Sequence, residues 1–243
     1  MRIPRIYTPQ SLTLNSTIEL DENASRHIGK VLRMDVGRDV IVFNGQGGEY
    51  RSTVSAVGKK IVSVHLSEFI DVQRQSPLQV ELAIGISRGE RFDWVLQKAT
   101  ELGVSRITPL FSERTEVKLN GARLESKVEH WQQILISACE QCQLNIVPQL
   151  NKPISLQSWL PTVQADLKLV SHHRYDKTLA EQAVPQSVCL LIGPEGGLSD
   201  AEINAAHGYS FTALTLGPRV FRTETAPIAA LALLQYLWGD FSS

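Results

Sequence analysis

The chain has 243 residues, of which 43% are hydrophobic and 20% charged, a balance typical of a globular protein of one or two domains. The formal net charge of −1 excludes a chain that is basic throughout, so nucleic acid would have to be bound by local clusters of Lys and Arg. The odd cysteine count argues against a secreted disulfide framework, and the single C-x-x-C has no second pair or histidine pair nearby, so we expect no metal site.

Neither a signal peptide nor a membrane span is expected. The opening MRIPRIYTPQ has no apolar core. The longest apolar run, 226–238, is interrupted by Gln235 and is shorter than the roughly 20 residues of a membrane helix. We therefore expect a cytoplasmic protein with no contact with a membrane.

The pattern of residues 1–72 predicts a small β-barrel. Short segments rich in β-branched residues alternate with turn signals such as NGQGG. The predicted strands are 16–20, 39–44, 49–57 and 59–66. One helix is expected at 23–32. On it Arg26, Lys30 and Arg33 fall at i, i+4 and i+7 and share one face, which by itself is usually only a solvated surface.

A polar segment, DVQRQSP, ends this region, and residues 73–243 have a different pattern. Short apolar segments alternate with segments of helical periodicity, which predicts a parallel sheet covered by helices on both faces. The predicted strands are 78–86, 107–111, 167–171, 188–192 and 212–216, and the predicted helices are 92–102 and 123–143. Gly103 stands where a left-handed residue would end the first helix. We therefore expect an α/β domain after the barrel.

Two loops of this second domain have the same construction. Each follows an apolar strand with Gly-Pro and a few polar residues, GPEGGL at 193–198 and GPRVFR at 217–222. After the first, Ser199 and Glu202 have the spacing of a capping box, which fixes the start of a helix. Open α/β sheets bind ligands at the carboxyl ends of their strands, and glycine permits close backbone approach. No Rossmann or Walker fingerprint is present, so the spacing alone leaves a ligand site and two ordinary turns as equal alternatives.

These residues also carry a specific resemblance. In order and spacing, seven segments resemble the RsmE family of 16S ribosomal RNA (uracil-N3)-methyltransferases, which belongs to the SPOUT superfamily. They are MRIPRIY, HIGKVLRM, SRGERFDWVLQKATELGV, PLFSER, ACEQC, GPEGGLSDAEI and LGPRVFRTETA. The resemblance implies an N-terminal PUA-like β-barrel and a C-terminal SPOUT domain with a parallel sheet and a trefoil knot. It also implies S-adenosyl-L-methionine (SAM) as methyl donor, a homodimer, and methylation of one uridine at N3 in the 16S rRNA of the assembled small (30S) subunit.

The same resemblance implies three sets of site residues. The residues expected to bind the cofactor are Leu191, Gly193, Glu195, Gly196, Gly197, Leu216, Gly217, Val220, Arg222, Thr223 and Ala226. The residues expected to contact RNA are Arg2, Arg5, Arg26, Lys30, Arg33, Arg88, Arg114 and Arg219. The residues expected to act in catalysis are Arg222 and Glu224.

Transfer to uridine N3 requires the base to lose a proton while N3 is held in line with the methyl group. Arg222 is expected to stabilise the base anion or to orient its carbonyl oxygens, and Arg219 to reach a flanking phosphate. Glu224 either accepts the proton or holds Arg222 in place through an ion pair.

Other residues near the second loop have simpler interpretations. Thr223 or Thr225 is expected to cap the last helix. His172 and His173 follow a strand near the expected pocket, and their role stays open.

One position departs from the family pattern. Similar proteins usually carry Gly-Arg after the EQC, whereas Gln143 and Leu144 stand there in this chain. If that arginine contacts RNA in relatives, another basic residue takes its part here, and the candidates are Arg123, Lys127 and Arg114.

The last helix is nearly all apolar and needs cover on every side, so Leu234 and Trp238 are expected at the dimer interface. Three other functions remain alternatives. The first is a non-catalytic RNA-binding or assembly protein, the second a nucleotide-dependent oxidoreductase, and the third a methyltransferase that acts on tRNA.

Overall fold

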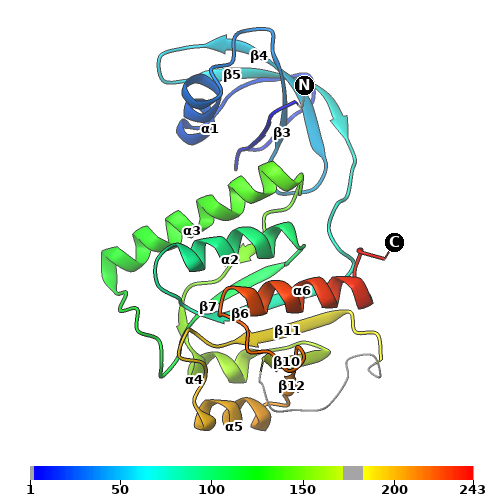
Figure 1. Ribbon diagram of the computed structural model, residues 1–243. Helices are drawn as coiled ribbons and strands as arrows, with labels where there is room; N and C mark the ends of the chain where they lie inside the picture. The colour runs from blue at the N-terminus through cyan, green and yellow to red at the C-terminus, as the bar shows by residue number, and fades with distance from the viewer. Residues whose placement is uncertain (1–2, 172–182, 243) are drawn as a thin grey trace. The chain divides into compact units, whose positions relative to one another are not determined.

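A computed structural model of the protein describes residues 3–171 and 183–242 (Figure 1). The chain divides into two compact units, each with its own sheet. Unit 1 comprises Met1–Gln75 and Cys139–Val147, and unit 2 comprises Ser76–Ala138 and Pro148–Ser243. The expected fold class is found, because unit 1 is a small β domain and unit 2 is an α/β domain with a parallel sheet.

Unit 1 is built on a mixed five-stranded sheet in the order β1-β3-β4-β5-β2. Its strands are β1 (Arg5–Tyr7), β2 (Thr17–Glu19), β3 (Asp39–Phe43), β4 (Glu49–Val57) and β5 (Val62–Ile70). β1 and β3 are parallel, and the other neighbours are antiparallel. Inward-facing residues such as Ile6, Val42, Val54 and Val64 are fully buried and pack with Ile28 into one core.

The four strands predicted for unit 1 are all present as β2 to β5, and the largest difference is in the last, which was predicted at 59–66 and is found at Val62–Ile70. The fifth strand begins at Val62 and not at residue 59, because the Gly58 N–H donates to the Ile61 carbonyl and closes a hairpin turn. The strand β1 was not expected.

The predicted helix of unit 1 is present as α1 (Glu22–Arg26), continued by a π-helical turn η1 (His27–Val31). It begins at Asp21, whose carboxylate accepts from the N–H groups of Asn23 and Ala24. It ends before Arg33, which has a φ of 49°. Arg26 and Lys30 are exposed on the helical segment. Arg33 is also exposed but lies beyond the end of the helix, so it does not share a helix face with them.

A buried cluster of polar residues lies at the edge of unit 1. The guanidinium of Arg5 donates to the Glu49 carboxylate and to the Asn145 side chain, and Arg74 also pairs with Glu49 at 2.8 Å. Burial acts to raise the pKa of the Glu49 carboxyl, but hydrogen bonds from Arg74 and Arg5 outweigh it and hold the pKa below its ordinary value. The Arg5 side chain is only 4% exposed, so its expected role as an RNA contact does not fit the structure.

Unit 2 is a parallel sheet in the order β12-β10-β11-β6-β7-β8, with β9 paired to β7. Its strands are β6 (Gln79–Gly85), β7 (Arg106–Phe111), β8 (Gln149–Leu150), β9 (Ile154–Ser155), β10 (Leu167–Ser171), β11 (Ser187–Ile192) and β12 (Thr212–Leu214). Its helices are α2 (Glu90–Glu101), α3 (Gly121–Cys142, whose last turn belongs to unit 1), α4 (Leu156–Trp159), the 3₁₀ turn η2 (Leu160–Thr162), α5 (Asp200–Gly208) and α6 (Thr225–Trp238).

Helices cover both faces of this sheet, as the continuous apolar strands predict (Figure 1). On one face α4, η2 and α5 pack against strand residues such as Ala83, Cys189 and Leu191. On the other face α2 packs against α6, and Leu96 and Leu231 are fully buried in these helices. α4 and the two-residue strands β8 and β9 were not expected, because they are too short to show a period.

Two local predictions of unit 2 are confirmed in detail. Gly103 has a φ of 75° just after α2, and the Val104 N–H donates to the Ala99 carbonyl, as in a glycine-terminated helix. Ser199 and Glu202 form the capping box of α5. In the two described ranges no helix is both long and apolar enough to cross a bilayer. The trefoil knot implied by the resemblance stays a prediction.

Candidate functional site

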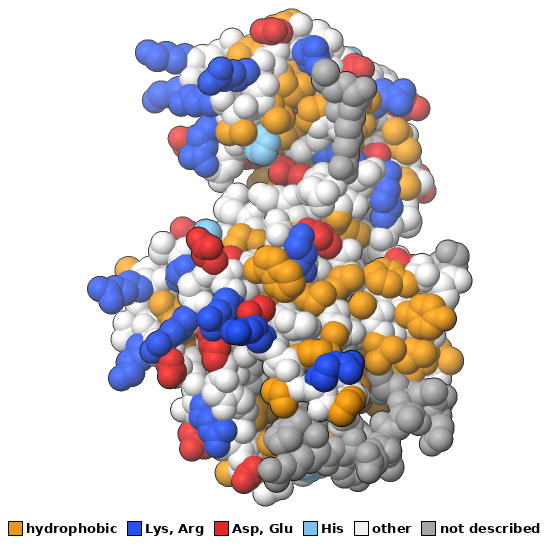
Figure 2. All heavy atoms as spheres, in the orientation of Figure 1, with side chains coloured by type: hydrophobic (Ala, Val, Ile, Leu, Met, Phe, Trp, Pro, Cys, Tyr) orange, Lys and Arg blue, Asp and Glu red, His pale blue; other side chains and the backbone are white. Residues whose placement is uncertain are grey.

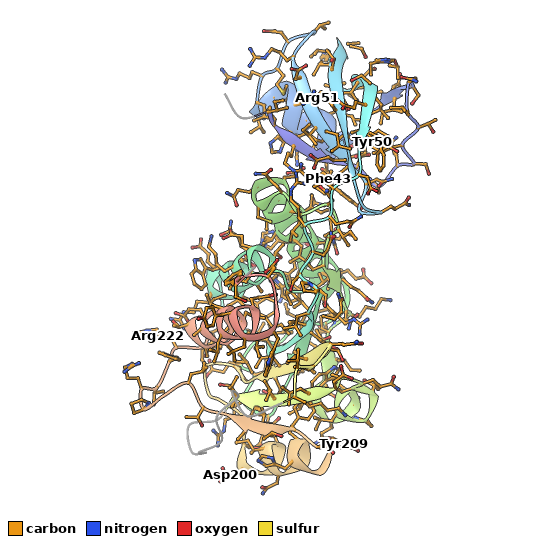
Figure 3. All side chains as sticks on the ribbon, turned by 90° about the vertical axis from the view of Figure 1, so that its right-hand side faces the viewer. Phe43, Tyr50, Arg51, Asp200, Tyr209 and Arg222 are labelled. Atoms are coloured by element: carbon orange, nitrogen blue, oxygen red, sulfur yellow. The ribbon has the colours of Figure 1, made fainter. Side chains whose placement is uncertain are left out.

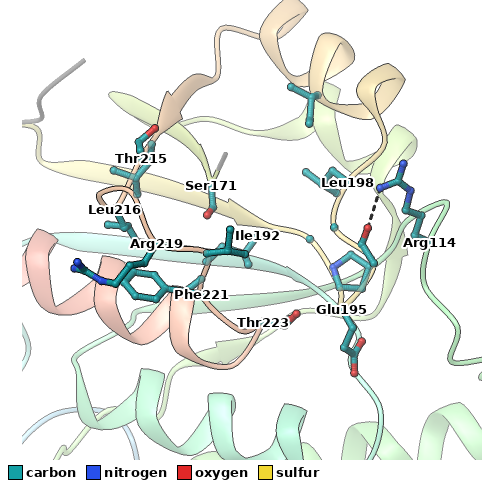
Figure 4. A pocket seen from close by; sticks show the side chains of 18 of the residues that line it. Arg114, Ser171, Ile192, Glu195, Leu198, Thr215, Leu216, Arg219, Phe221 and Thr223 are labelled. Atoms are coloured by element: carbon teal, nitrogen blue, oxygen red, sulfur yellow. Dashed lines mark hydrogen bonds between the residues drawn. The ribbon is translucent and has the colours of Figure 1, made fainter. Parts of the chain in front are cut away.

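A cavity of about 340 Å³ opens in unit 2 where β10, β11 and β12 end (Figure 4). Ser171, Ile192 and Leu214 line it from the ends of these strands, and most of the remaining wall comes from the loops 193–198 and 215–223. Arg114, Asp200, Ile203 and Ala226 complete it. Its size is within the range of small-molecule sites, and its place is where open α/β sheets bind ligands.

The first loop packs so closely that two glycines leave no room for a side chain. A Cβ on Gly193 would lie 2.8 Å from the backbone of Gly197 and Leu198. One on Gly85, at the end of β6, would lie 2.5 Å from Pro194. Gly197 has a φ of 69°, which favours glycine, and its N–H donates to the Pro194 carbonyl at 2.8 Å. The Gly-Pro turn therefore lies directly against β6.

The second loop begins earlier than expected. β12 ends at Leu214, and the predicted strand residues Thr215 and Leu216 leave the sheet to line the cavity. Figure 4 shows Thr215, Leu216, Arg219 and Phe221 together at one end of the cavity.

The second loop leads into α6 without a side-chain cap. The N-cap residue is Glu224, whose side chain makes no capping hydrogen bond, and the Arg222 carbonyl accepts from the N–H groups of Thr225 and Ala226. The expected cap by Thr223 or Thr225 is therefore wrong. Thr223 lines the cavity instead.

Most residues expected to bind the cofactor line this cavity. They are Gly193, Glu195, Gly196, Gly197, Leu216, Gly217, Val220, Thr223 and Ala226. Leu191 does not fit the expectation. It is fully buried in β11, where it pairs with Val170 of β10 and Ala83 of β6, so both its side chain and its backbone are used inside the sheet.

The two expected catalytic residues precede and follow the cavity residue Thr223 in the sequence, and neither of them lines the cavity. Arg222 is exposed at the outer edge of unit 2 (Figure 3), and Glu224 is half-buried. Thr223, between them, is a lining residue. The structure thus brings this short segment to the cavity while the Arg222 side chain stays on its outer side.

The side chain of Glu195, the one charged residue of the first loop, is turned away from the cavity. The Glu195 carboxylate accepts from the Arg88 N–H at 2.9 Å and lies 3.6 Å from the Arg91 guanidinium. Figure 4 shows its side chain directed away from the other lining residues. The Glu195 side chain therefore connects the loop to the start of α2 and to the residue Arg88 before it.

The basic residues expected to contact RNA are found in different settings. Exposed in unit 1 are Arg26, Lys30 and Arg33, and exposed in unit 2 are Arg88, Arg114 and Arg219. Arg88 pairs with Glu116 at 2.9 Å, and Arg114 donates to the Gly196 carbonyl at 2.9 Å. Arg2, like His172 and His173, lies outside the described residues.

Two cavity residues on α5 were not expected. Asp200 and Ile203 belong to the first turn of this helix and line the cavity. The two residues are three positions apart at the start of the helix that follows the glycine loop, so they lie on one helix face. This spacing can be read from the sequence. No group of three His, Cys, Asp or Glu that could hold a metal ion is found within 3–171 and 183–242.

Comparison with known proteins gives two family matches and relatives that align from end to end. Residues 74–235 match an RNA methyltransferase domain, and residues 20–67 match an RNA methyltransferase PUA domain. The ribosomal RNA small subunit methyltransferase E of Buchnera aphidicola (from Acyrthosiphon pisum, strain APS) is 34% identical over 99% of this chain and 96% of its own. That of Bacillus subtilis (strain 168) is 32% identical over 94% of this chain and 93% of its own. The chain belongs to the ribosomal RNA small subunit methyltransferase E family.

Two solved structures of similar proteins contain SAM. A methyltransferase of Legionella pneumophila, solved in complex with SAM, is 43% identical, with a TM-score of 0.97 over 99% of this chain and 100% of that one. A ribosomal RNA small subunit methyltransferase E of Neisseria gonorrhoeae, bound to SAM, is 36% identical, with a TM-score of 0.95 over the same shares. Both agree in fold with this member of the methyltransferase E family along its whole length.

Proposed function

We propose that this protein uses SAM to methylate N3 of a specific uridine in 16S rRNA, acting as a homodimer on the assembled small (30S) subunit. The observation that carries the proposal is the cavity at the ends of β10, β11 and β12, whose walls are the two Gly-Pro loops. It is supported by full-length relatives named as rRNA methyltransferases and by similar structures that hold SAM. Action on ribosomes also places the protein in the cytoplasm.

The residues of the cavity fit SAM. Gly193, Gly196 and Gly197 line the cavity and have no side chains, so at these positions the loop offers only its peptide groups to a ligand. Leu216, Val220 and Ala226 add apolar surface for an adenosine ring. We propose that these residues, with Gly217 and Thr223, hold the cofactor.

When bound, SAM supplies a methyl group on a sulfonium, and N3 of the uridine loses its proton as the methyl group is transferred. The protein then has to hold the base in line and to stabilise its negative charge. Arg222, at the outer edge next to the cavity residue Thr223, is our first choice for the base anion, and Arg219 for a flanking phosphate. Glu224 either accepts the proton or keeps Arg222 in place.

Arg222→Ala tests the catalytic assignment. Loss of one donor to a developing anion typically lowers kcat by about 100-fold or more, and we expect that loss with SAM affinity unchanged. Arg106→Ala is the matched control, because Arg106 is an exposed arginine of the same unit at the opposite, amino end of the sheet. Near-normal turnover of Arg222→Ala would remove this residue from the mechanism.

Unit 1 is proposed to bind RNA through exposed cations around α1 and η1. Lys and Arg side chains gather over this segment in Figure 2, and structured RNA is recognised largely through phosphate and 2′-OH contacts. Charge reversal at Arg26 and Lys30 should weaken binding to small subunits without changing SAM affinity. Arg51→Glu, an exposed change on β4 of the same unit, should leave binding as it was. Binding that is unchanged by the double reversal across a salt series would contradict this role.

The proposed dimer uses the outer face of α6. Tyr236 is 62% exposed there, and Trp94 of the adjoining α2 is 42% exposed, so apolar side chains remain uncovered on this part of unit 2 (Figure 2). Leu234 is fully buried within its own chain, so its expected role at the interface is wrong, whereas Trp238 is half-buried and stays in the proposal. Tyr236→Lys should shift the protein from dimer to monomer in sedimentation, whereas Tyr209→Lys, on the exposed tyrosine after α5, should not. A monomeric wild type would refute the dimer.

The decisive experiment is methyl transfer from labelled SAM to unmodified small subunits, with naked 16S rRNA and tRNA in parallel. We expect 3-methyluridine in small-subunit RNA, identified by mass. Methylation of tRNA alone would favour the tRNA alternative. SAM binding without transfer to any RNA would leave a binding protein, and nicotinamide dinucleotide binding without SAM binding would leave an oxidoreductase.

A further inference from the structure

The peptide group between Gly196 and Gly197 is held from both sides. Its carbonyl oxygen, on Gly196, accepts from Arg114 Nη1 at 2.9 Å, and its N–H, on Gly197, donates to the Pro194 carbonyl at 2.8 Å. Because a peptide group is planar, two hydrogen bonds at opposite ends fix its orientation. Figure 4 shows the Arg114 contact reaching the loop from a neighbouring segment.

Packing supports the same contact. A Cβ on Gly196 would lie 3.0 Å from Arg114 Cβ and 3.4 Å from Arg114 Cδ, so the side chain of Arg114 lies along the loop. The preceding residue, Glu113, donates its N–H to Glu202 Oε1 at 2.8 Å, and Glu202 Oε2 accepts from the Ser199 N–H at 2.9 Å. Two consecutive residues after β7 thus hold both the tip of the glycine loop and the start of α5.

We propose that Arg114 is a positioning residue for the cofactor: it fixes the Gly196–Gly197 peptide in the orientation that SAM requires. The inference rests on the proposed function of the cavity, which Arg114 itself lines. It differs from the expectation that Arg114 contacts RNA. Ordering the loop before the ligand arrives lowers the entropic cost of binding, so the benefit appears in cofactor affinity.

The test compares Arg114→Ala and Arg114→Lys with wild type, and Arg106→Ala serves as the control at the other end of β7. Calorimetry gives the Kd for SAM and for S-adenosylhomocysteine. Steady-state kinetics give KM for SAM, KM for small subunits and kcat. Hydrogen exchange of residues 193–199 is measured in the unliganded proteins, because a loop that is no longer held exchanges faster.

For Arg114→Ala we expect about tenfold weaker binding of both ligands, the low end for a charge-assisted hydrogen bond because Arg114 is exposed. KM for SAM should rise similarly, kcat should change little, and exchange at 193–199 should accelerate. Arg114→Lys keeps a donor and should recover part of the affinity, and Arg106→Ala should match wild type.

Unchanged affinity for SAM would overturn the inference, and a rise confined to KM for small subunits would return Arg114 to an RNA contact. Equal losses in Arg114→Ala and Arg106→Ala would also overturn it, because the effect would then be general destabilisation. A wild-type protein that binds no SAM would instead refute the proposed function.

Discussion

Gly193→Ala should disrupt the proposed cofactor site through steric overlap alone. The new Cβ would stand 2.8 Å from Gly197 C and from Leu198 N, closer than real Cβ contacts come. Both are backbone atoms held by the turn and by the capping box of α5, so neither can rotate away as the end of a flexible side chain would. The loop has to open, and overpacking of this kind costs about 1–3 kcal/mol.

The cost can fall on ligand binding or on folding, and two measurements separate these. If it falls on the binding conformation, SAM affinity measured by calorimetry drops by about 5- to 150-fold. If it falls on the folded state, Tm decreases by roughly 2–4 °C for each kcal/mol in a chain of this size. Gly208→Ala is the control, because its added Cβ would have no atom within 4 Å other than those of its chain neighbours and its own helix backbone. A Gly193→Ala protein with wild-type Tm and SAM affinity within twofold would refute the steric reasoning.

Further predictions concern unit 1. Gln143 has a φ of 73°, a backbone conformation that glycine adopts more easily than other residues. Gln143→Gly should therefore raise the free energy of unfolding, measured in urea, by up to about 1 kcal/mol, whereas Gln143→Ala should not. A lower stability of the glycine variant would contradict this account of strain. Glu49→Gln should cost about 3 kcal/mol at neutral pH because it breaks a buried ion pair. The pKa of Glu49 is lowered in the folded state, so its contribution to stability is present above the ordinary carboxyl pKa and is lost as the pH falls through the pKa of the folded protein. The free energy of unfolding should therefore fall more steeply with acid in wild type than in Glu49→Gln. Parallel curves for the two proteins would argue against the ion pair. Burial raises the pKa of the Cys139 thiol, so iodoacetamide at about pH 8 should label it slowly until the chain is unfolded, and fast labelling of the native protein would show that it is accessible.

Much of the fold follows from short-range rules. The predicted strand 49–57 coincides with β4, and the helix caps at Gly103 and Ser199 are found where the residue types place them. What the sequence could not provide depends on distant partners. Arg5 is buried because Glu49 and Asn145, 44 and 140 residues away along the chain, surround its guanidinium.

The site was predictable to a similar degree. The glycine loop could be located from its residues, since glycine and proline determine the turn. Which side chains line the cavity depends on orientation, and there the sequence misled: Leu191 is used by the sheet, and Glu195 turns to Arg88 and Arg91. The hydrogen bond from Arg114 to the Gly196 carbonyl, 82 residues away, likewise has no local signature in the sequence.

The course of α3 limits how the two units could be exchanged or separated. The helix starts in unit 2, and its end, from Cys139, is built into unit 1, where Cys139 and Leu144 pack with Phe43. No single cut of the chain frees either unit intact, and a fragment starting at Ser76 would leave those apolar side chains without their cover. Recombination between relatives, or an engineered fusion, would have to transplant two separate stretches of chain to move the β domain. The two units therefore cannot be exchanged as consecutive segments of the chain.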